Sequence, residues 1–373
     1  MNNNKNRTAL SRRDFLKLST AATITAVAGY TLYEYQPWLS YSEQTNLTWR
    51  PLAKETNALP QMHELVRYAT LAANGHNTQP WKFAIKENAI EIHPDFSRQL
   101  PVVDPHNREL WISLGCALEN LIVAARATGF TPEITYPDVA DFIHVQLTAD
   151  TPLENPLFHA IPLRQNTRSE FDGQPVMAAD LDQIQSQTLE PGVALRLITN
   201  PADLETVVEY TNQGNLSQYA DNSFIDELIY WLRFNKKEAL AALDGLYSRC
   251  SGNPEVPGWL GRMFVAGTKP QQQADIDTQK LRSSPAAIVI ASEADDKSDW
   301  VRTGQVYERL ALQMTSLNIK SAFLNQPIET AELRSQFQNA IGLDTSLPQL
   351  LVRFGYAEAM PRSLRRPVEA VLL

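Results

Sequence analysis

The apolar positions of this chain recur with two periods, one typical of helices and one typical of strands. Between residues 110 and 128 they return every three or four residues, which predicts a long helix with a buried face. Gly129 directly follows this run and marks the expected end of the helix. Residues 81–85 and 89–93 are short apolar runs on either side of a polar tripeptide, which predicts two paired strands.

The second half of the chain follows a similar order. Helices are expected at 178–188, 201–219, 222–234, 300–317 and 329–341, and strands at 193–198, 286–291, 319–324 and 350–356. Each half thus runs helix, strand, long helix, strand. Glu119-Asn120-Leu121 and Glu308-Arg309-Leu310 occupy corresponding places in the two long helices. We predict an α+β fold, an α/β sandwich built from two pseudo-repeated halves.

The same pattern divides the chain into segments. We expect a signal at 1–28, an extended or irregular linker at 29–60, an N-terminal half at 61–150 and a C-terminal half at 151–373. The second half contains an additional stretch, 236–277, that holds Gly, Pro and Trp259. This insert is either a lid over a pocket or a plain surface insertion.

The N-terminal segment carries the pattern of an export signal. Ser11-Arg12-Arg13-Asp14-Phe15-Leu16-Lys17 precedes a mildly apolar run that ends at Ala28, which indicates the twin-arginine route. The signal is either cleaved after Ala28 or kept as a membrane anchor, and the alternative is a chance basic N-terminus on a cytosolic protein. We expect the twin-arginine export machinery to deliver the protein to the periplasm or cell envelope.

Charge and composition exclude several classes of function. The net charge is −9, and because the first 28 residues carry +4, the remainder carries −13. A protein with this much negative charge repels the phosphate backbone, so binding to nucleic acid is not expected. The two cysteines form no disulfide framework, and Cys116 is expected to be a buried thiol. The six histidines show no metal-binding spacing, so no metal is expected.

Two polar segments are candidates for ligand binding. The loop 74–81 is dense in amide side chains, which suit a ring with mixed donors and acceptors; the alternative is an ordinary helix-to-strand turn. Arg164-Gln165-Asn166-Thr167-Arg168 places two guanidinium groups four residues apart, where they could clamp a phosphate; the alternative is a solvated arginine pair. The chain has no G-x-G-x-x-G or G-x-S-x-G motif, and reactivity supplied by a bound cofactor fits this absence.

An ordered set of motifs from about residue 60 to the end resembles the FMN-dependent nitroreductase family. Residues 77–81 resemble its N-x-Q-P-W element, residues 113–121 its S-x-G-x-A-x-q-N-L helix, and residues 164–171 its arginine-rich phosphate segment. Pro327-Ile328-Glu329, residues 351–356 and Arg365-Arg366-Pro367 complete the set. Here the loop precedes the arginine segment, the reverse of the usual order. This is similar to a long-chain branch in which two family-like halves in one chain mimic the family homodimer.

The resemblance implies FMN as cofactor and assigns residues to it. Arg164 and Arg168 would hold its phosphate, helped by Arg365 or Arg366. Asn77 and Gln79 of one half would face Arg164, Asn166 and Arg168 of the other across an internal interface. Glu329 and Thr330 would lie beside the flavin N5 edge.

The resemblance also implies an exported FMN-binding oxidoreductase that passes electrons between a small-molecule donor and an organic acceptor. The alternatives are a flavin-sequestering or storage protein with little turnover, and an envelope structural protein that has lost flavin. We expect a monomer, with a dimer as the alternative.

Overall fold

The computed structural model describes residues 29–30, 33, 40–52, 58–136 and 141–373. The twin-arginine stretch, the apolar run after it and Ala28 lie outside the described residues, so the predicted signal and its cleavage stay predictions.

Two four-stranded antiparallel sheets form the frame of the described chain. The first contains β1 (Trp81–Ile85), β2 (Ala89–Pro94), β3 (Phe130–Thr135) and β4 (Ile143–Ala149), in the order β1-β2-β4-β3. The second contains β5 (Val193–Ile198), β8 (Ala286–Ser292), β9 (Lys320–Phe323) and β10 (Leu347–Gly355), in the order β5-β8-β10-β9. Counted along the chain, both sheets place their strands in the order first, second, fourth, third.

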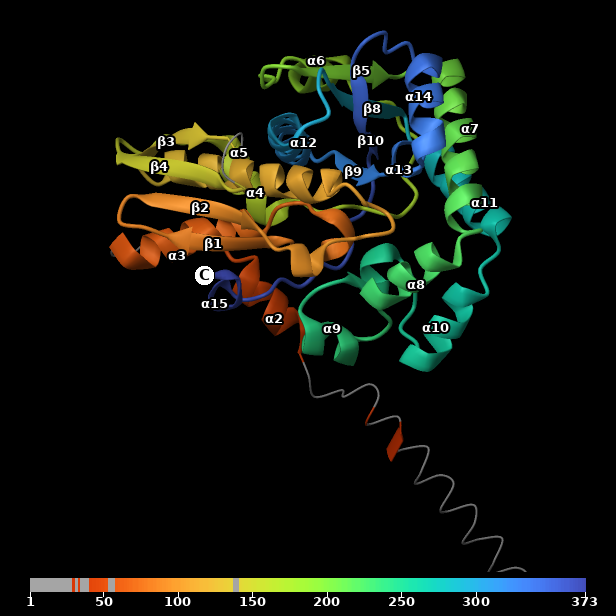
Figure 1. Cartoon of the computed structure of the whole chain (residues 1–373), viewed down its shortest axis with the longest axis horizontal. Coiled ribbons are helices and arrows are strands. Elements are labelled where there is room, and N and C mark those ends of the chain that lie inside the picture. The colour runs from red at the N-terminus through yellow and green to blue at the C-terminus, as the bar shows by residue number, and fades with distance from the viewer. Residues whose placement is uncertain (1–28, 31–32, 34–39, 53–57, 137–140) are drawn as a thin grey trace, which may run out of the picture.

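Each half also places one long helix between its second and third strands. These helices are α4 (Arg108–Ala127) and α12 (Lys297–Ser316). They pack against each other between the two sheets (Figure 1). Together with the shared strand order, this arrangement confirms the predicted α+β fold of two pseudo-repeated halves.

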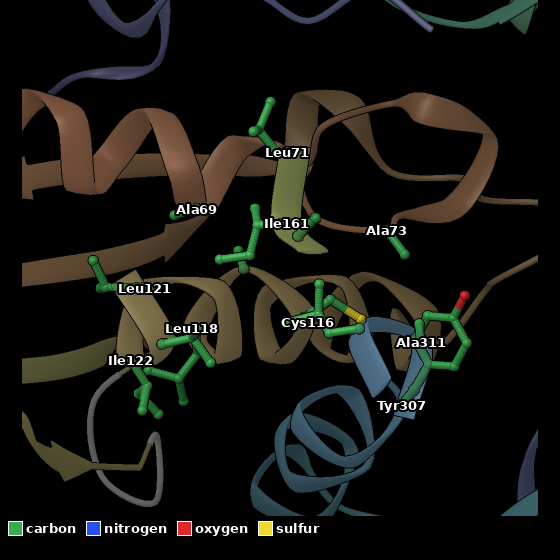
Figure 2. Close-up of a cluster of buried hydrophobic side chains, with 14 of the residues drawn as sticks. Ala69, Leu71, Ala73, Cys116, Leu118, Leu121, Ile122, Ile161, Tyr307 and Ala311 are labelled. Atoms are coloured by element: carbon green, nitrogen blue, oxygen red, sulfur yellow. The ribbon is translucent and has the colours of Figure 1, made fainter. Parts of the chain in front are cut away.

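The interface between the two long helices is the centre of the main apolar core. Figure 2 shows Cys116 of α4 near Tyr307 and Ala311 of α12, and all three are buried. The thiol of Cys116 is therefore buried as predicted. By length and composition α4 is the one described helix that could cross a membrane, but 89% of that window is buried inside the protein. It is a core helix of this fold.

Each sheet receives an extra edge contact from a segment outside its four strands. Asn166 forms a parallel bridge with Ser321 of β9, and Leu372 forms one with Phe83 of β1. The backbone N–H of Thr167 donates to the Ser321 carbonyl at 2.9 Å, and that of Leu373 donates to the Phe83 carbonyl at 2.9 Å. The arginine segment is thus fixed on the second sheet and the C-terminus on the first.

The two halves differ most between their first two strands. In the first half β1 and β2 are joined by residues 86–88, whereas β5 and β8 are joined by residues 199–285. This connection contains α7 (Pro201–Gln218), α8 (Asn222–Trp231), β6 (Leu232–Arg233), α9 (Lys236–Ala242), β7 (Leu246–Tyr247), α10 (Gly258–Ala266) and α11 (Pro270–Arg282). The predicted insert 236–277 is part of this larger helical segment, which lies beside the cores of the two halves in Figure 1.

The region expected to be an extended or irregular linker is partly helical. Residues 41–48 form α2 (Tyr41–Thr48), whose first turn is capped because the Ser40 hydroxyl accepts from the Glu43 N–H at 3.1 Å. The next helix, α3 (Ala58–Thr70), begins three residues before 61, where the N-terminal half was expected to start. The remaining helices are α5 (Pro156–Ala160), α6 (Ala178–Gln185), α13 (Gln326–Glu329), α14 (Ala331–Ala340) and α15 (Val368–Val371). The predicted helix 329–341 is interrupted because Thr330 is extended, with φ −87° and ψ 106°.

Candidate functional site

Two neighbouring cavities meet at the arginine segment and the polar loop. The larger, here called the polar cavity, has a volume of about 250 Å³ and is bordered by both halves and by α8 and α11. The smaller, here called the basic cradle, has a volume of about 50 Å³ and is bordered by four arginines: Arg164, Arg168, Arg362 and Arg365. The two cavities share the lining residues Ala73, Asn74, Asn166, Arg168 and Leu246. An elongated ligand with an anionic end and a polar ring could extend from one cavity into the other.

Two of the four cradle arginines have donor groups left for a ligand. Within the described chain, Arg168 has no hydrogen bond or ion pair to another residue, although it borders both cavities. The Nη1 atom of Arg362 is buried and has no hydrogen-bond partner among the described residues. A buried guanidinium nitrogen without an acceptor costs free energy that an anion would recover. The geometry therefore suits a phosphate, which guanidinium groups bind through paired hydrogen bonds.

The other two arginines are fixed by the protein itself. Arg164 is 3% exposed, pairs with Glu308 at 2.8 Å between Nε and Oε1, and donates to the Leu71 carbonyl at 2.9 Å. Arg365 donates to the Thr70 carbonyl at 2.8 Å and to Asn77 Oδ1 at 2.6 Å. Burial lowers the pKa of Arg365 to about 9, so it remains charged at neutral pH. These residues shape the cradle and contribute positive charge.

The polar loop has an unusual backbone that its own amide side chains hold in place. His76, Asn77 and Gln79 have φ values of 48°, 54° and 54°, in the left-handed region. Asn77 donates through Nδ2 to the carbonyls of Gly245 and Leu364 at 3.0 and 3.1 Å. Its side-chain oxygen accepts from an arginine, so the amide is engaged by protein groups on both sides.

Gln79 is fully buried and anchors the same loop. Its Nε2 donates to the Leu243 carbonyl at 2.9 Å, and its Oε1 accepts from the Arg366 N–H at 2.8 Å. The Arg366 guanidinium in turn donates to the Gln79 carbonyl at 2.7 Å. Neither residue borders either cavity. Their geometry assigns them to loop support, and a direct contact with a ligand stays a prediction for both.

The remaining predicted residues divide between the two cavities and the protein interior. Asn77 and Asn166 border the basic cradle together with Arg164, Arg168 and Arg365. Glu329 borders the polar cavity, as do Asn166 and Arg168. Thr330 is buried and borders neither cavity. Six of the nine predicted residues therefore line the paired cavities. Gln79, Thr330 and Arg366 do not line either cavity.

Several wall residues were not predicted from the sequence. Arg362 borders the cradle where Arg366 was an expected candidate. Its place in the arginine-rich run 362–366 is a signal, but the run does not reveal which side chains turn inward. Trp49 also borders the cradle; its indole N–H donates to the Ser363 carbonyl at 2.9 Å, and its ring lies 5.2 Å from the Arg362 guanidinium carbon. The predicted linker therefore contributes a wall of the site.

His76 is a further residue that the sequence did not single out for the site. It borders the polar cavity and makes no hydrogen bond to a described residue. Burial lowers the pKa of His76 to about 4, and the charge of Arg168 lowers it further in the same direction. At neutral pH it is a neutral imidazole that can donate or accept one hydrogen bond.

Comparison with known proteins gives relatives over most of the chain, although no protein-family model matches it. A Mycobacterium tuberculosis (strain H37Rv) protein provisionally named NAD(P)H nitroreductase Rv3131 is 26% identical over 336 residues, covering 86% of this chain and 94% of the relative. The provisionally named NAD(P)H nitroreductase acg of the same strain is 24% identical over 320 residues, covering 82% and 93%.

Solved structures similar to this chain include an FMN-bound nitroreductase from Bacteroides fragilis, 16% identical with a TM-score of 0.34, covering 57% of this chain and 96% of that one. Another is NfnB from Mycobacterium smegmatis in complex with NADPH, 12% identical with a TM-score of 0.35, covering 56% and 94%.

The sequence relatives match this chain across both halves rather than across one. The match covers 86% of this chain and 94% of Rv3131, so the relative has the same long, single-chain form. The resemblance to the nitroreductase family is therefore confirmed: over both of its halves this chain is similar to proteins provisionally named NAD(P)H nitroreductases.

Proposed function

We propose that this protein is an exported, FMN-dependent oxidoreductase of the nitroreductase type. The observation that carries the proposal is the pair of joined cavities, one basic and one polar, with unused guanidinium donors in the basic one. FMN has a phosphate at one end and a ring with mixed donors and acceptors at the other. The residues present therefore fit this cofactor.

The basic cradle would hold the phosphate and the polar cavity the ring. Arg168 and Arg362 have donors available for the phosphate, while Arg164 and Arg365 add charge from fixed positions. Asn74 and Asn166 border both cavities and would contact the middle of the ligand. Bound there, FMN supplies two-electron chemistry at its N5 position. The chain's own role is to bind and orient the ring and to exclude water from it.

The names of the relatives and the predicted export signal both bear on which electron donor and acceptor the protein uses. Names of the relatives point to NAD(P)H as donor. The twin arginines at Arg12-Arg13 point instead to a compartment with little nicotinamide. We propose that the protein folds with FMN before export and works in the periplasm or envelope, as a monomer, with a donor other than free NAD(P)H and a small organic acceptor.

Flavin release tests the cofactor. Purified protein, once denatured, should release a yellow chromophore that behaves as FMN rather than riboflavin, since the cradle selects for phosphate. Arg168→Met should lower FMN affinity about 10- to 100-fold, as expected when a charge-assisted phosphate contact worth about 1.5–3 kcal/mol is lost. Arg282→Met is a matched control because Arg282 is exposed and pairs with Glu205 on the surface. Colourless protein that cannot be loaded with FMN would overturn the proposal.

A flavin-sequestering function is the second candidate, and one observation favours it. Gln218, Tyr219, Phe224, Leu228, Gln273, Asp277 and Lys280, all from the 199–285 connection, border the polar cavity. This connection therefore forms a wall of the cavity. The insert 236–277 contributes Leu246, Gln273 and Asp277 to that wall, which supports the reading of the insert as a lid rather than a plain surface insertion. Photoreduced protein that quinones and nitroaromatic compounds fail to reoxidise would favour storage over catalysis.

A further inference from the structure

Two glutamates from different halves of the chain meet at the wall of the polar cavity. Glu109 lies in the first turn of α4 and Glu329 at the end of α13, and both border the cavity. Their carboxyl groups lie close enough that, in addition to burial, the charge of Glu329 raises the pKa of Glu109. Two like charges this close in a buried site disfavour ionisation of both groups, which favours one proton retained by the pair.

Neighbouring donors fix which oxygens are free for this shared proton. Glu109 Oε1 accepts from Arg108 Nη2 at 3.0 Å and from Asn325 Nδ2 at 3.3 Å. The orientation of Asn325 is set because its Oδ1 accepts from the Leu351 N–H at 2.9 Å. Glu329 Oε2 accepts from Gln218 Nε2 at 2.6 Å. Each carboxyl group therefore has one oxygen occupied by a donor and one available to its partner.

The charges around the pair favour one retained proton. Against the larger effect of burial, the guanidinium of Arg108 lowers the pKa of three carboxyl groups, those of Asp104, Glu109 and Glu329. Asp104, Arg108 and Glu109 are each less than 9% exposed. Burial raises the pKa of both glutamates, that of Glu109 well above its usual range, and the partner carboxyl raises the pKa of Glu109 further. Because the two carboxyl groups interact, the pKa values that a titration reports describe the pair and not either glutamate alone.

Glu329 also borders a third cavity on its other side, here called the outer cavity. This cavity, of about 990 Å³, is lined by Asp104, His106, Arg108, Lys297 and Arg334 and by the exposed Asp295 and Asp296. Exposed residues on its rim connect it to solvent. The carboxyl pair thus lies between a solvent-connected cavity and the cavity proposed to hold the ring.

We propose that the Glu109–Glu329 pair is the proton donor for the acceptor reduced in the polar cavity, and that solvent in the outer cavity restores its proton. The proposal rests on the proposed function. For a quinone acceptor, the hydride with both electrons comes from the reduced cofactor and the proton from the pair. One carboxyl O–H bond breaks, a hydroquinone O–H bond forms, and the pair is left fully ionised until a proton from bulk solvent reaches it through the outer cavity.

Infrared spectroscopy tests the shared proton independently of turnover. Protein without flavin at pH 7 should show a carbonyl band of a protonated carboxylic acid, and this band should be lost in both Glu109→Gln and Glu329→Gln. In either variant the new amide can donate to the remaining carboxylate, which then ionises. Glu332→Gln, an exposed glutamate of the neighbouring α14, should keep the band. A band that persists in both variants would overturn the shared proton.

Acceptor reduction tests the role of the pair. Rates are compared per bound flavin: in Glu109→Gln and Glu329→Gln, quinone reduction by the pre-reduced protein should slow about 100-fold, as for loss of a general acid. The fall in rate toward alkaline pH should disappear in these variants and remain in Glu332→Gln. If the flavin-loaded variants reduced quinone at the full rate, the proton-donor role of the pair would be overturned and the proposed function would stand. A wild-type protein without flavin would overturn the proposed function and the proton-donor role with it.

Discussion

Gly115 of α4 and Gly304 of α12 lie against each other where the two long helices cross. A Cβ atom on Gly304 would lie 2.9 Å from the Gly115 Cα and 2.0 Å from the Ile112 carbonyl oxygen. A Cβ atom on Gly115 would lie 2.0 Å from the Val301 carbonyl oxygen. Both glycines begin the same motif, Gly-x-x-x-Glu-x-Leu, at 115–121 and 304–310. The two halves therefore meet through equivalent positions of their equivalent helices.

Replacement of Gly115 by alanine should destabilise the protein although alanine is the better helix former. Helix propensity would favour alanine by about 1 kcal/mol, whereas the clash is with backbone that cannot move aside. Overpacking of this kind costs about 1–3 kcal/mol or more, so we expect a net loss of about 2 kcal/mol in urea unfolding. Ser316→Ala, on the exposed end of α12, should stay within about 0.5 kcal/mol of the wild type. Equal stability of Gly115→Ala and wild type would contradict the close crossing.

The buried pair Arg164–Glu308 should be sensitive to loss of either partner. Glu308 is fully buried, and its removal leaves the Arg164 charge without its counter-ion. We expect Glu308→Gln to lower the free energy of unfolding by about 3 kcal/mol and to reduce FMN retention, because Arg164 borders the cradle. Glu205→Gln breaks the exposed pair with Arg282 and should leave the unfolding midpoint unchanged. If Glu308→Gln changed the free energy of unfolding as little as Glu205→Gln does, burial of the Arg164–Glu308 pair would not matter for stability.

His76 should remain neutral down to about pH 4. Its pKa of about 4 in the folded protein lies below the usual value of 6.5, so the unfolded chain binds more protons between these pH values. The contribution of His76 to stability is full above pH 6.5 and is lost as the pH falls toward 4. His76→Asn, which suits a φ of 48°, should remove this loss. NMR titration of the imidazole gives the midpoint, and His63→Asn, at an exposed position, is the control. A midpoint near 6.5 would refute the neutral imidazole.

Trp49 should support both stability and phosphate binding. Its indole covers Arg362 and Arg365, with ring centroid distances of 5.2 and 5.1 Å to their guanidinium carbons. Trp49→Ala should cost about 3 kcal/mol of stability and weaken FMN binding about tenfold, because Arg362 loses a fixed neighbour. Calorimetric titration of apoprotein measures the affinity. Leu47→Ala, from the same segment but 65% exposed, should bind FMN as the wild type does; if it weakens binding equally, the effect is not specific to Trp49.

The twin arginines should direct export. Replacement of Arg12 and Arg13 by lysine should leave the protein in the cytoplasm, since this route depends on the arginine pair itself rather than on charge. Cell fractionation measures the distribution, and Lys5→Arg, which lies outside the motif, should not alter it. Export of the double lysine variant at the normal level would exclude the twin-arginine route.

The sequence predicted helices and strands accurately where the apolar residues of the element recur with a clear helical or strand period. The strands 81–85 and 193–198 and the long helix near 110–128 agree with β1, β5 and α4 to within two residues at each end. The prediction failed at α2, a short helix with a polar sequence and little apolar periodicity, whose start depends on the Ser40 cap. It also joined α13 to α14, because the extended conformation of Thr330 has no signature in neighbouring residues.

The site was predictable in kind but not in detail. Arginines and amides in the right segments indicated a phosphate and a ring, because the chemistry of these groups is independent of the fold. Which side chains face the ligand was not predictable in residues 362–366, where Arg362 and Arg365 border the cradle and Arg366 supports the loop. That segment lies outside the helices and strands, so no periodicity relates its positions to an inner and an outer face.

The sequence by itself determined the segments of secondary structure, the division into two halves and the chemical character of the ligand, since each depends on nearby residues or residue types. Only the tertiary structure decided that Glu109 meets Glu329, that Arg168 keeps free donors while Arg164 is paired, and that Trp49 closes the cradle. These relations join residues 100 to 300 positions apart. They depend on how two sheets and two crossing helices pack, and packing at such separations leaves no periodic mark on the chain.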